Sequence, residues 1–545
     1  MKPFHPMLFT TLRSYSKETF VKDLISGIIV AIIALPLSIA LALASGVGPE
    51  EGLYTAIIAG FLISAFGGST VQISGPTAAF ATIVAGVVAT YGMSGLALAT
   101  LMAGIILIVM GLCKFGNLIK FIPYTITTGF TAGIAVTIFI GQLKDFMGLT
   151  FAPHMAPVET MEKLECVILS LGTLNLWAVV VGLVCLAVLI LWPKVSKRIP
   201  GSLIAVLVGI AMVKLFDLPV NTIGDLYSIS GALPTFHMPA ISFGLVQEVL
   251  PDAFTIAILA AIESLLSAVV ADEMVEERHN SNMELVAQGL GNMASALFGG
   301  IPATGAIART AANINNGGRS PVAGMVHAIV LLLVLVLLMP YAALIPMPTI
   351  AAILFIVAYN MSHMHKLIEI VQKAPKSDVA VLLLSFALTV IFDLVVAISV
   401  GLGLACLMFM KRMADESDVK EWDYVEITDD EDGRLKPVPA NVMVYEISGP
   451  MFFGSADKIP AIDNRNGEKT VLILRMRAVP AIDATAMNGV TRLVKQCEKA
   501  GIQVIFSHVN EQPMREFRHS GVFEMVGEEF FQPNTDAALE KAMSL

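Results

Sequence analysis

The feature that most constrains this chain is the scarcity of charge over long stretches. Between Lys22 and Lys114 the only charged residues are Asp23, Glu50 and Glu51. Charged residues make up 14% of the chain and hydrophobic residues 56%, whereas soluble domains carry about 25% charged residues. About 20 apolar residues span the hydrocarbon core of a bilayer. We therefore expect several membrane-spanning segments rather than the core of one soluble domain.

Apolar stretches recur in two series. The first comprises residues 24–44, 53–66, 76–91, 95–112, 124–142, 174–192 and 202–215. The second comprises residues 252–271, 284–298, 306–314, 322–342, 345–360, 378–392 and 394–410. The first stretch is longer than the apolar core of a signal peptide and further spans follow it, so we expect it to be retained.

An internal repeat relates the two series. Gly67-Gly68 recurs as Gly299-Gly300, 232 residues later, and Ile122-Pro123 recurs as Ile345-Pro346, 223 residues later. Each half thus holds about seven elements, and an odd number means that the second copy enters with opposite topology. Inverted repeats with interrupted helices at matching positions point to a substrate site at the midplane. The alternative is chance recurrence, because glycine pairs are common in membrane helices.

The third element of each series is expected to be a broken helix. In the first, Thr70 to Ile73 is extended in character, and Gly75-Pro76 is expected to start a helix because proline suits a first turn. In the second, the helix is expected at 306–314. Free N–H groups at such helix starts bind anions. In an inverted repeat the two starts face each other, so two helix dipoles would hold one anion.

Two ionisable residues in apolar surroundings are the main functional candidates. Arg309 lies about one turn into the second half-helix and is expected to shape the site, the alternative being a structural salt bridge. Glu263 lies inside an apolar run, where desolvation disfavours a charged carboxylate, so it could carry a proton or hold a cation. The alternative for Glu263 is a carboxylate bonded to backbone or paired with Arg309.

Lysine and arginine in the short loops predict the orientation of the spans. Those on one side, expected to be the cytoplasm, are Lys2, Arg13, Lys17, Lys22, Lys114, Lys120, Lys194, Lys197, Arg198, Lys366, Lys373, Lys376, Lys411 and Arg412. The opposite loops carry mainly acidic residues, with Lys144 and Lys163 as exceptions. An even number of spans then places both termini in the cytoplasm, in a multi-pass protein of the inner (plasma) membrane.

The composition changes after Met413. We expect a transmembrane transport domain at 1–412, a solvated acidic linker at 413–437 that contains Asp429-Asp430-Glu431-Asp432, and a small α/β domain at 438–545. In that domain the patterns predict strands at 442–447, 471–476 and 502–506, a helix at 484–499 capped by Asp483, and a helix starting at 514–518.

Other classes of function are not expected. The five cysteines show no CxxC or Cys/His spacing, so no metal site is implied. The sequence has no nucleophile–base set and no phosphate-cradling loop, so neither an enzyme nor a bound cofactor is expected. No region is basic enough to hold nucleic acid.

The chain resembles the SulP (sulfate permease) family of anion transporters over nearly its whole length. The resemblance rests on Leu35-Pro36-Leu37-Ser38-Ile39-Ala40, Gly52-Leu53-Tyr54-Thr55-Ala56, Ser74-Gly75-Pro76-Thr77, Ala306-Ile307-Ala308-Arg309-Thr310 and Ser448-Gly449-Pro450-Met451-Phe452-Phe453. It implies an α-helical polytopic fold of fourteen segments in two inverted seven-segment repeats, with a core that moves against a gate. It also implies a homodimer and a cytoplasmic STAS domain at the C-terminal end.

The resemblance also implies which residues surround the anion, between the third and tenth segments with the first and eighth alongside. The expected substrate-binding residues are Leu37, Ser38, Leu41, Ser74, Gly75, Thr77, Phe80, Gly305, Ala306, Ile307, Ala308 and Arg309. Some relatives have a glutamine at the position of Leu37, so that polar contact is missing here.

Ion coupling and regulation follow from the same resemblance. Glu263 and Ser267 are expected to couple an ion. Relatives that carry bicarbonate with sodium have aspartate and threonine at these positions, which favours a proton over sodium here. Thr485 lies near the serine that is phosphorylated in anti-sigma factor antagonists, the alternative being an ordinary helix-start threonine.

The expected function is secondary active transport of a small anion (sulfate, bicarbonate or a C4-dicarboxylate) by proton-coupled symport with alternating access. Its expected partners are the anion, the coupling proton and the lipid bilayer. Two alternatives stay open, an anion channel on the same fold and an anion sensor that signals through the STAS domain.

Overall fold

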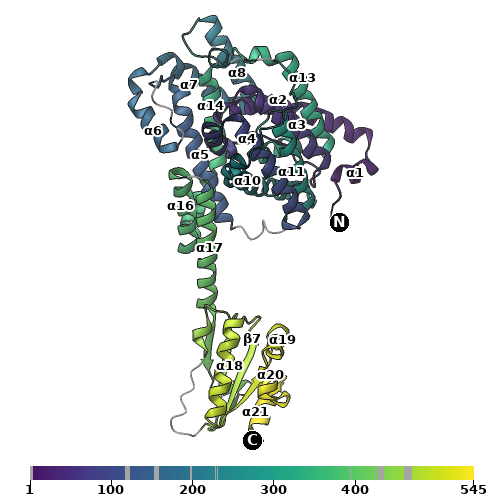
Figure 1. Ribbon diagram of the computed structural model, residues 1–545, viewed down its shortest axis with the longest axis vertical. Helices are drawn as coiled ribbons and strands as arrows, with labels where there is room; N and C mark the ends of the chain where they lie inside the picture. Colours follow the sequence, from purple (N-terminus) through teal and green to yellow (C-terminus); the bar gives the residue numbers. More distant parts are fainter. Residues whose placement is uncertain are drawn as a thin grey trace. The chain divides into compact units, whose positions relative to one another are not determined.

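The computed structural model describes residues 4–116, 123–152, 157, 159–196, 199–227, 229, 231–392, 394–422, 424–426, 435–459 and 469–545. The chain forms two compact units, Met1–Leu402 and Gly403–Leu545 (Figure 1). Some residues used in the sequence-based predictions lie outside the described residues, namely Lys2, Lys120, Ile122, Lys197, Arg198 and the acidic run 429–432.

The first unit consists of two series of elements in matching order. The first series is α2 (Lys17–Ala44), α3 (Pro49–Phe66), β1 (Ser74–Gly75), α4 (Ala81–Leu112), α5 (Tyr124–Met147), α7 (Leu176–Val195) and α8 (Gly201–Leu215). The second series is α10 (Phe243–Val275), α11 (Ser281–Leu297), β2 (Thr304–Gly305), α12 (Ile307–Asn315), α13 (Pro321–Ala342), α14 (Met347–Ser362), α16 (Lys376–Ile391) and α17 (Leu394–Glu416). Short helices lie before or between them, namely α1 (Met7–Thr11), α6 (Thr160–Leu169), α9 (Ile223–Leu226) and α15 (Met364–Lys373). Every predicted apolar stretch overlaps one of these elements, with ends that differ by a few residues.

The helices of the first unit suit a membrane. Seven stretches among the described residues are long and apolar enough to cross one, namely Lys17–Ala44, Ala78–Leu112, Tyr124–Met147, Leu176–Val195, Phe243–Val275, Pro321–Ala342 and Met347–Lys373. Gly92 interrupts α4 with φ 69° and ψ −174°, a backbone conformation that residues with a Cβ rarely adopt. The two segments predicted at 76–91 and 95–112 are therefore both present, on either side of this glycine.

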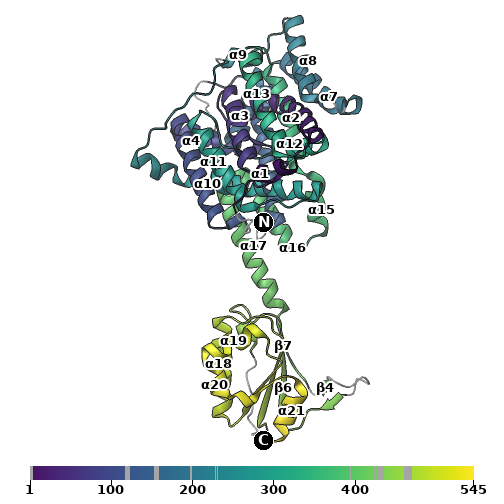
Figure 2. The same ribbon diagram turned by 90° about the vertical axis from the view of Figure 1, so that its right-hand side faces the viewer.

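Elements from the two halves of the first unit pack against each other (Figures 1 and 2). One close approach joins α4 to α11, where a Cβ added to Gly104 would lie 2.7 Å from the carbonyl oxygen of Gly289. A Cβ on Gly289 would in turn lie 2.5 Å from the carbonyl oxygen of Gly104. Small residues of this kind let two helix backbones approach each other inside a membrane. Helices of the first half thus pack directly on helices of the second half, as the predicted inverted repeat leads us to expect.

A buried carboxylate ties the start of α2 to the start of α13. Asp23 accepts hydrogen bonds from the backbone N–H of Arg319 at 2.9 Å and from the hydroxyl groups of Ser320 and Tyr15. Burial, together with the hydrogen bond to Asp23, raises the pKa of Tyr15 to about 12. The phenol therefore stays protonated and donates, so the N-terminal end of the chain is anchored to the second repeat.

The second unit is a five-stranded sheet with helices on both faces (Figure 2). Its elements are β3 (Asp418–Glu421), β4 (Tyr424–Glu426), β5 (Leu435–Pro437), β6 (Val442–Ser448), β7 (Val471–Ala478), α18 (Ala484–Lys499), β8 (Gln503–Ser507), α19 (Glu511–Ser520), α20 (Val522–Val526), β9 (Phe531–Gln532) and α21 (Thr535–Met543). The strand order is β3-β6-β7-β8-β9, with β6 to β9 parallel and β3 antiparallel at one edge. The predicted strands and helices are confirmed, and Asp483 accepts from Ala486 N at 2.8 Å as the predicted cap of α18.

Part of the predicted acidic linker differs from the expectation. Residues 418–421 form β3, which pairs with β6 instead of lying free in solvent. The physical reason is the alternation along this segment, because Val419 packs on the hydrophobic core of the sheet while its charged neighbours face outward. The end of α17 also belongs to this unit, since Lys458 Nζ donates to the carbonyl oxygens of Ala414 and Ser417 at 2.7 and 2.6 Å.

In the first unit, α11 holds the extended segment that leads into β2. Asn292 is fully buried, and its amide bonds both backbone groups of Ala303, accepting from N at 2.8 Å and donating to O at 2.9 Å. The side chain therefore substitutes for a strand partner that the backbone of Ala303 lacks.

We expect Asn292→Leu to destabilise the first unit. The substitution leaves two buried backbone groups unpaired, each at a cost of about 1–3 kcal/mol. The measurement is the thermal unfolding midpoint of the purified protein in detergent, with Asn316→Ala as the control because Asn316 is only partly buried and bonds its own helix. Equal midpoints for Asn292→Leu and the unmodified protein would contradict this account of Asn292.

Candidate functional site

The centre of the first unit is the meeting point of the two broken segments. β1 and β2 pair antiparallel, with Ser74 opposite Gly305, and next to them Ala306 N donates to Ile73 O at 2.9 Å. Because the strands are antiparallel, the helices that follow them leave in opposite directions. The predicted pair of interrupted elements is therefore present, and each satisfies the backbone of the other.

The first helix starts later than expected. The prediction placed its start at Gly75-Pro76, but Thr77 has extended backbone (φ −127°, ψ 159°), and the first helical turn is Ala78–Phe80, which leads into α4. The reason is that the preceding groups have other partners. The carbonyl oxygen of Pro76 accepts from Arg309 Nη2, and the hydroxyl of Thr77 donates to Glu263. The second helix starts as predicted, with α12 beginning directly after Ala306.

Arg309 reaches from α12 across to the first broken segment. Its side chain is 1% exposed, and Nη2 donates to Pro76 O. A Cβ on Gly75 would overlap Arg309 Nη1, so only glycine leaves room for the guanidinium there. Arg309 Nε and Nη1 have no hydrogen-bond partner, and no acid pairs with Arg309 among the described residues. The alternative of a structural salt bridge with Glu263 is therefore not what the structure shows.

Glu263 joins α10 to the first broken segment. Thr77 Oγ1 donates to Glu263 Oε2 at 2.9 Å, and the carboxylate is partly exposed. The next residue, Ser264, joins α10 to the second broken segment, because Gly305 N donates to its Oγ at 3.0 Å. Ser264 Oγ also lies 2.6 Å from Thr304 Oγ1. Two adjacent residues of one helix thus contact both strands.

The predicted site residues divide into two groups. Those that the structure joins to one another by hydrogen bonds, strand pairing or direct contact are Ser74, Gly75, Thr77, Glu263, Gly305 and Arg309, and the N–H of Ala306 bonds the residue before β1. Phe80 joins this group through its backbone, because Phe80 N donates to Thr77 O at 3.3 Å. Among the described residues, no side-chain hydrogen bond or strand pairing joins the group to Leu37, Ser38, Leu41, Ser267, Ile307 or Ala308. Ser38 and Ser267 are buried and their hydroxyl groups have no partner, whereas Ile307 and Ala308 are exposed. Thr485 lies in the second unit, exposed in the first turn of α18.

A row of polar residues on α11 supports the site and was missed by the sequence analysis. Glu284 accepts from Gly68 N at 2.9 Å and from the amides of Gln72 and Gln288 at 2.8 and 2.9 Å. Gln288 also donates to Ser74 Oγ at 3.2 Å. Polar residues recur on this otherwise apolar helix at Glu284, Gln288, Asn292 and Ser295, nearly every fourth residue, and all four are buried. This spacing on one helix face is the signal that could have identified the row.

Comparison with known proteins places this arrangement in a family. Residues 20–385 match the sulfate permease family, and residues 435–541 match the STAS domain. The chain belongs to the sulfate permease family. Membership makes this permease a multi-pass membrane transporter rather than an enzyme.

Curated relatives cover nearly all of the permease. It is 39% identical to the putative sulfate transporter YvdB of Bacillus subtilis, over 96% of this chain and 98% of that protein. It is 31% identical to the bicarbonate transporter BicA of Picosynechococcus sp., over 96% of this chain and 94% of that one.

Solved structures share the fold of the permease. A murine Slc26a9 anion transporter in the inward-facing state superposes with a TM-score of 0.89 at 19% identity, covering 99% of this chain and 94% of that one. The transmembrane domain of a cyanobacterial BicA superposes with a TM-score of 0.64 at 31% identity, covering 70% of this chain and 98% of that one. The predicted α-helical fold with inverted repeats and a C-terminal STAS domain is confirmed.

We expect Gly75→Ala to impair transport by the permease. The added Cβ would displace the Arg309 guanidinium from the strand pair. The backbone of Gly75 cannot easily move away, because Gly75 is paired with Thr304. The measurement is uptake of labelled sulfate and bicarbonate into proteoliposomes, with Gly86→Ala as the control because a Cβ on Gly86 meets no atom within 4 Å. Unchanged uptake by Gly75→Ala would show that the position of Arg309 does not matter for transport.

Proposed function

We propose that this permease is a secondary active transporter that moves a small anion together with a proton by alternating access. The observation that carries the proposal is Arg309, a buried guanidinium without an acidic partner at the meeting point of the two broken segments. A buried cation is costly unless it is paired. An anion would supply the missing partner for Nε and Nη1, and would do so only while it is bound.

The rest of the predicted site would complete the binding surface. Thr77 leads from β1 into the helical turn before α4, and Ala306 leads from β2 into α12. Helix starts favour anions on both sides. Ser38 on α2 and Ser267 on α10 hold buried hydroxyl groups without partners, which suits residues that gain a partner from a ligand or its water. The remaining proposed lining residues are Leu37, Leu41, Ser74, Phe80, Gly305, Ile307 and Ala308.

The contact between Glu263 and Thr77 offers a mechanism for coupling. An ionised carboxylate only accepts hydrogen bonds, so it holds the hydroxyl proton of Thr77. A protonated Glu263 can itself donate to Thr77, which frees the threonine hydroxyl to donate to an anion. Proton and anion would then bind together, which is the requirement for symport. A proton fits this contact better than sodium. A proton on Glu263 needs one hydrogen-bond partner, and the structure places the hydroxyl group of Thr77 beside the Glu263 carboxylate.

The substrates that we propose to test are sulfate, bicarbonate and C4-dicarboxylates such as succinate. The named relatives carry or are thought to carry sulfate and bicarbonate. We further propose a homodimer in the inner (plasma) membrane with both termini in the cytoplasm, on the basis of the lysine and arginine distribution and the family resemblance. Exposed Thr485 is a candidate phosphorylation site at the start of α18.

We expect Arg309→Ala to abolish most transport. Loss of charge-assisted hydrogen bonds to the anion corresponds to about a 10- to 100-fold drop in kcat/KM. Uptake into proteoliposomes is measured for each candidate anion, with Arg319→Gln as the control because Arg319 is exposed and its side chain donates to carbonyl oxygens of its own segment. Full activity of Arg309→Ala with every anion would rule out the proposed binding site.

We expect Glu263→Gln to separate anion binding from proton coupling. The amide keeps the size of the side chain but does not change its charge with pH, so uptake should lose its response to an inward proton gradient. The measurement compares uptake at equal and at unequal pH across the vesicle membrane, with and without a clamped voltage. Uptake by the unmodified protein that ignores both pH and voltage would exclude proton symport.

A further inference from the structure

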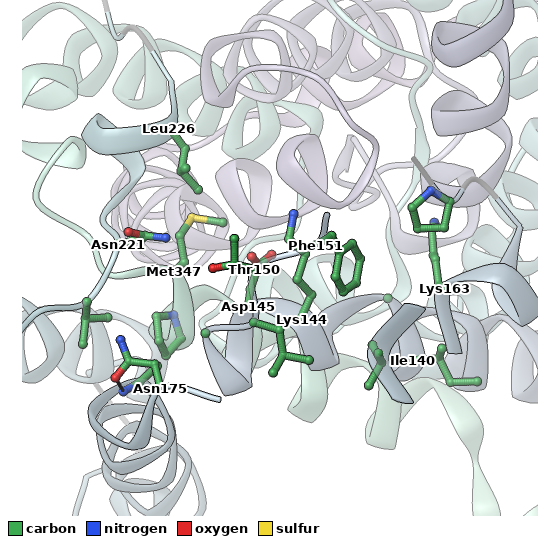
Figure 3. Close-up of a pocket in the computed structure, with 18 of the residues that line it drawn as sticks. Ile140, Lys144, Asp145, Thr150, Phe151, Lys163, Asn175, Asn221, Leu226 and Met347 are labelled. Carbon is green, nitrogen blue, oxygen red and sulfur yellow. Dashed lines mark hydrogen bonds between the residues drawn. The ribbon is translucent and has the colours of Figure 1, made fainter. Parts of the chain in front are cut away.

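A cavity of about 530 Å³ lies in the first unit away from the site described above (Figure 3). The end of α5, the start of α7, α6 and the start of α14 surround it. None of the residues proposed to bind or couple the transported ions lines this cavity. Its volume is within the range of sites for small ligands, about 300–1,000 Å³.

Two lysines line this cavity, Lys144 and Lys163. They are the two exceptions to the predicted distribution of basic residues between the loops on the two sides of the membrane. Lys144 lies in the last turn of α5, with Nζ 5.0 Å from the ring centre of Phe151, which also lines the cavity. Lys163 lies on α6, is partly buried, and forms no hydrogen bond or ion pair through Nζ among the described residues. Burial lowers the pKa of Lys163, opposed by the charge of Glu162.

A carboxylate sits beside the lysines. Asp145 follows Lys144 on α5 and lines the same cavity, and its carboxylate forms no hydrogen bond or ion pair within 4 Å with the described residues. Thr150 lies next to Asp145 in Figure 3, and Asn221 lines the cavity on the other side of Met347; both have polar side chains. At neutral pH the three charged groups sum to a single positive charge. The cavity is thus lined by two ammonium groups that form no hydrogen bond or ion pair with the described residues, and by one carboxylate.

We propose that this cavity is a second anion site, which binds a monovalent oxyanion or carboxylate between Lys144 and Lys163. One negative charge balances the local charge, and two ammonium groups hold the two oxygens of a carboxylate or of a singly charged oxyanion. Asp145 disfavours divalent anions and accepts from a ligand that carries a hydroxyl group. The occupant is either a free anion or the phosphate of an anionic lipid, which present the same chemistry.

The test measures how fast the amine of Lys163 is acetylated. The full chain in nanodiscs of phosphatidylcholine is treated with N-succinimidyl acetate, and acetylation of each lysine is followed by peptide mass spectrometry with increasing formate. We expect formate to protect Lys163, whereas Lys214, an exposed lysine that does not line the cavity, should not be protected. Nanodiscs with phosphatidylglycerol identify the source, because a lipid occupant protects Lys163 without added formate.

Variants separate charge effects from damage to the fold. Lys144→Gln should raise the half-protecting formate concentration about tenfold, since one charge-assisted contact is lost. Asp145→Asn should lower it, because a repulsive charge is removed, and general misfolding would not produce opposite signs. Arg309→Ala should leave protection unchanged, so failure of the transport site and failure of this one are distinguishable. Absence of protection in both lipids, or equal protection in Lys144→Gln, would overturn the proposal.

Discussion

The hydrogen-bonded pair β1–β2 is the interaction on which the membrane unit depends. Non-helical backbone among membrane-spanning segments must find partners within the protein, because hydrocarbon offers none. Ser74–Gly75 and Thr304–Gly305 solve this for each other, and each comes from a different half of the chain. The same pairing fixes the directions of α4 and α12, so it brings Thr77 and Arg309 to one place.

Polar residues surround this pair in a unit that is otherwise apolar. Glu284, Asn292 and Ser264 accept hydrogen bonds from the backbone N–H groups of Gly68, Ala303 and Gly305 in the two extended segments. A buried polar group left unpaired costs about 1–3 kcal/mol, which explains why so many side chains serve the backbone here. Some groups still lack a hydrogen-bond partner among the described residues, namely Arg309 Nε and Nη1, the hydroxyl groups of Ser38 and Ser267, and the amide oxygens of Gln72 and Gln288. Arg309 differs from the others because its unpartnered nitrogens belong to a buried cation, which is the costliest of these groups to leave unpaired.

The two units distribute their apolar side chains in ways that suit different solvents. The first unit buries small residues between helices and exposes large apolar side chains such as Leu183, Ile190 and Leu337. The second unit instead packs a sheet core between α18 and α21 and keeps its charges outside. The last turn of α17 is bound to the second unit through Lys458, so a movement of that helix end and of the sheet domain would be linked.

The amino-acid sequence by itself determined the place of the long apolar helices, the repeat, and the order of three strands and two helices in the second unit. These follow from hydropathy, periodicity and capping, which act within short stretches of chain. It also singled out Arg309 and Glu263, because charge among apolar residues is visible without a structure. The family resemblance supplied most of the other site residues.

The tertiary structure alone decided which of these groups touch. The helix start moved from Gly75-Pro76 to Ala78 because partners from α10 and α12, distant in the sequence, occupy the groups of Pro76 and Thr77. Val419 joined the sheet for a similar reason, since a long-range core outweighed the local acidic composition. Contacts between residues far apart in the chain depend on how the elements pack, and no local pattern encodes them.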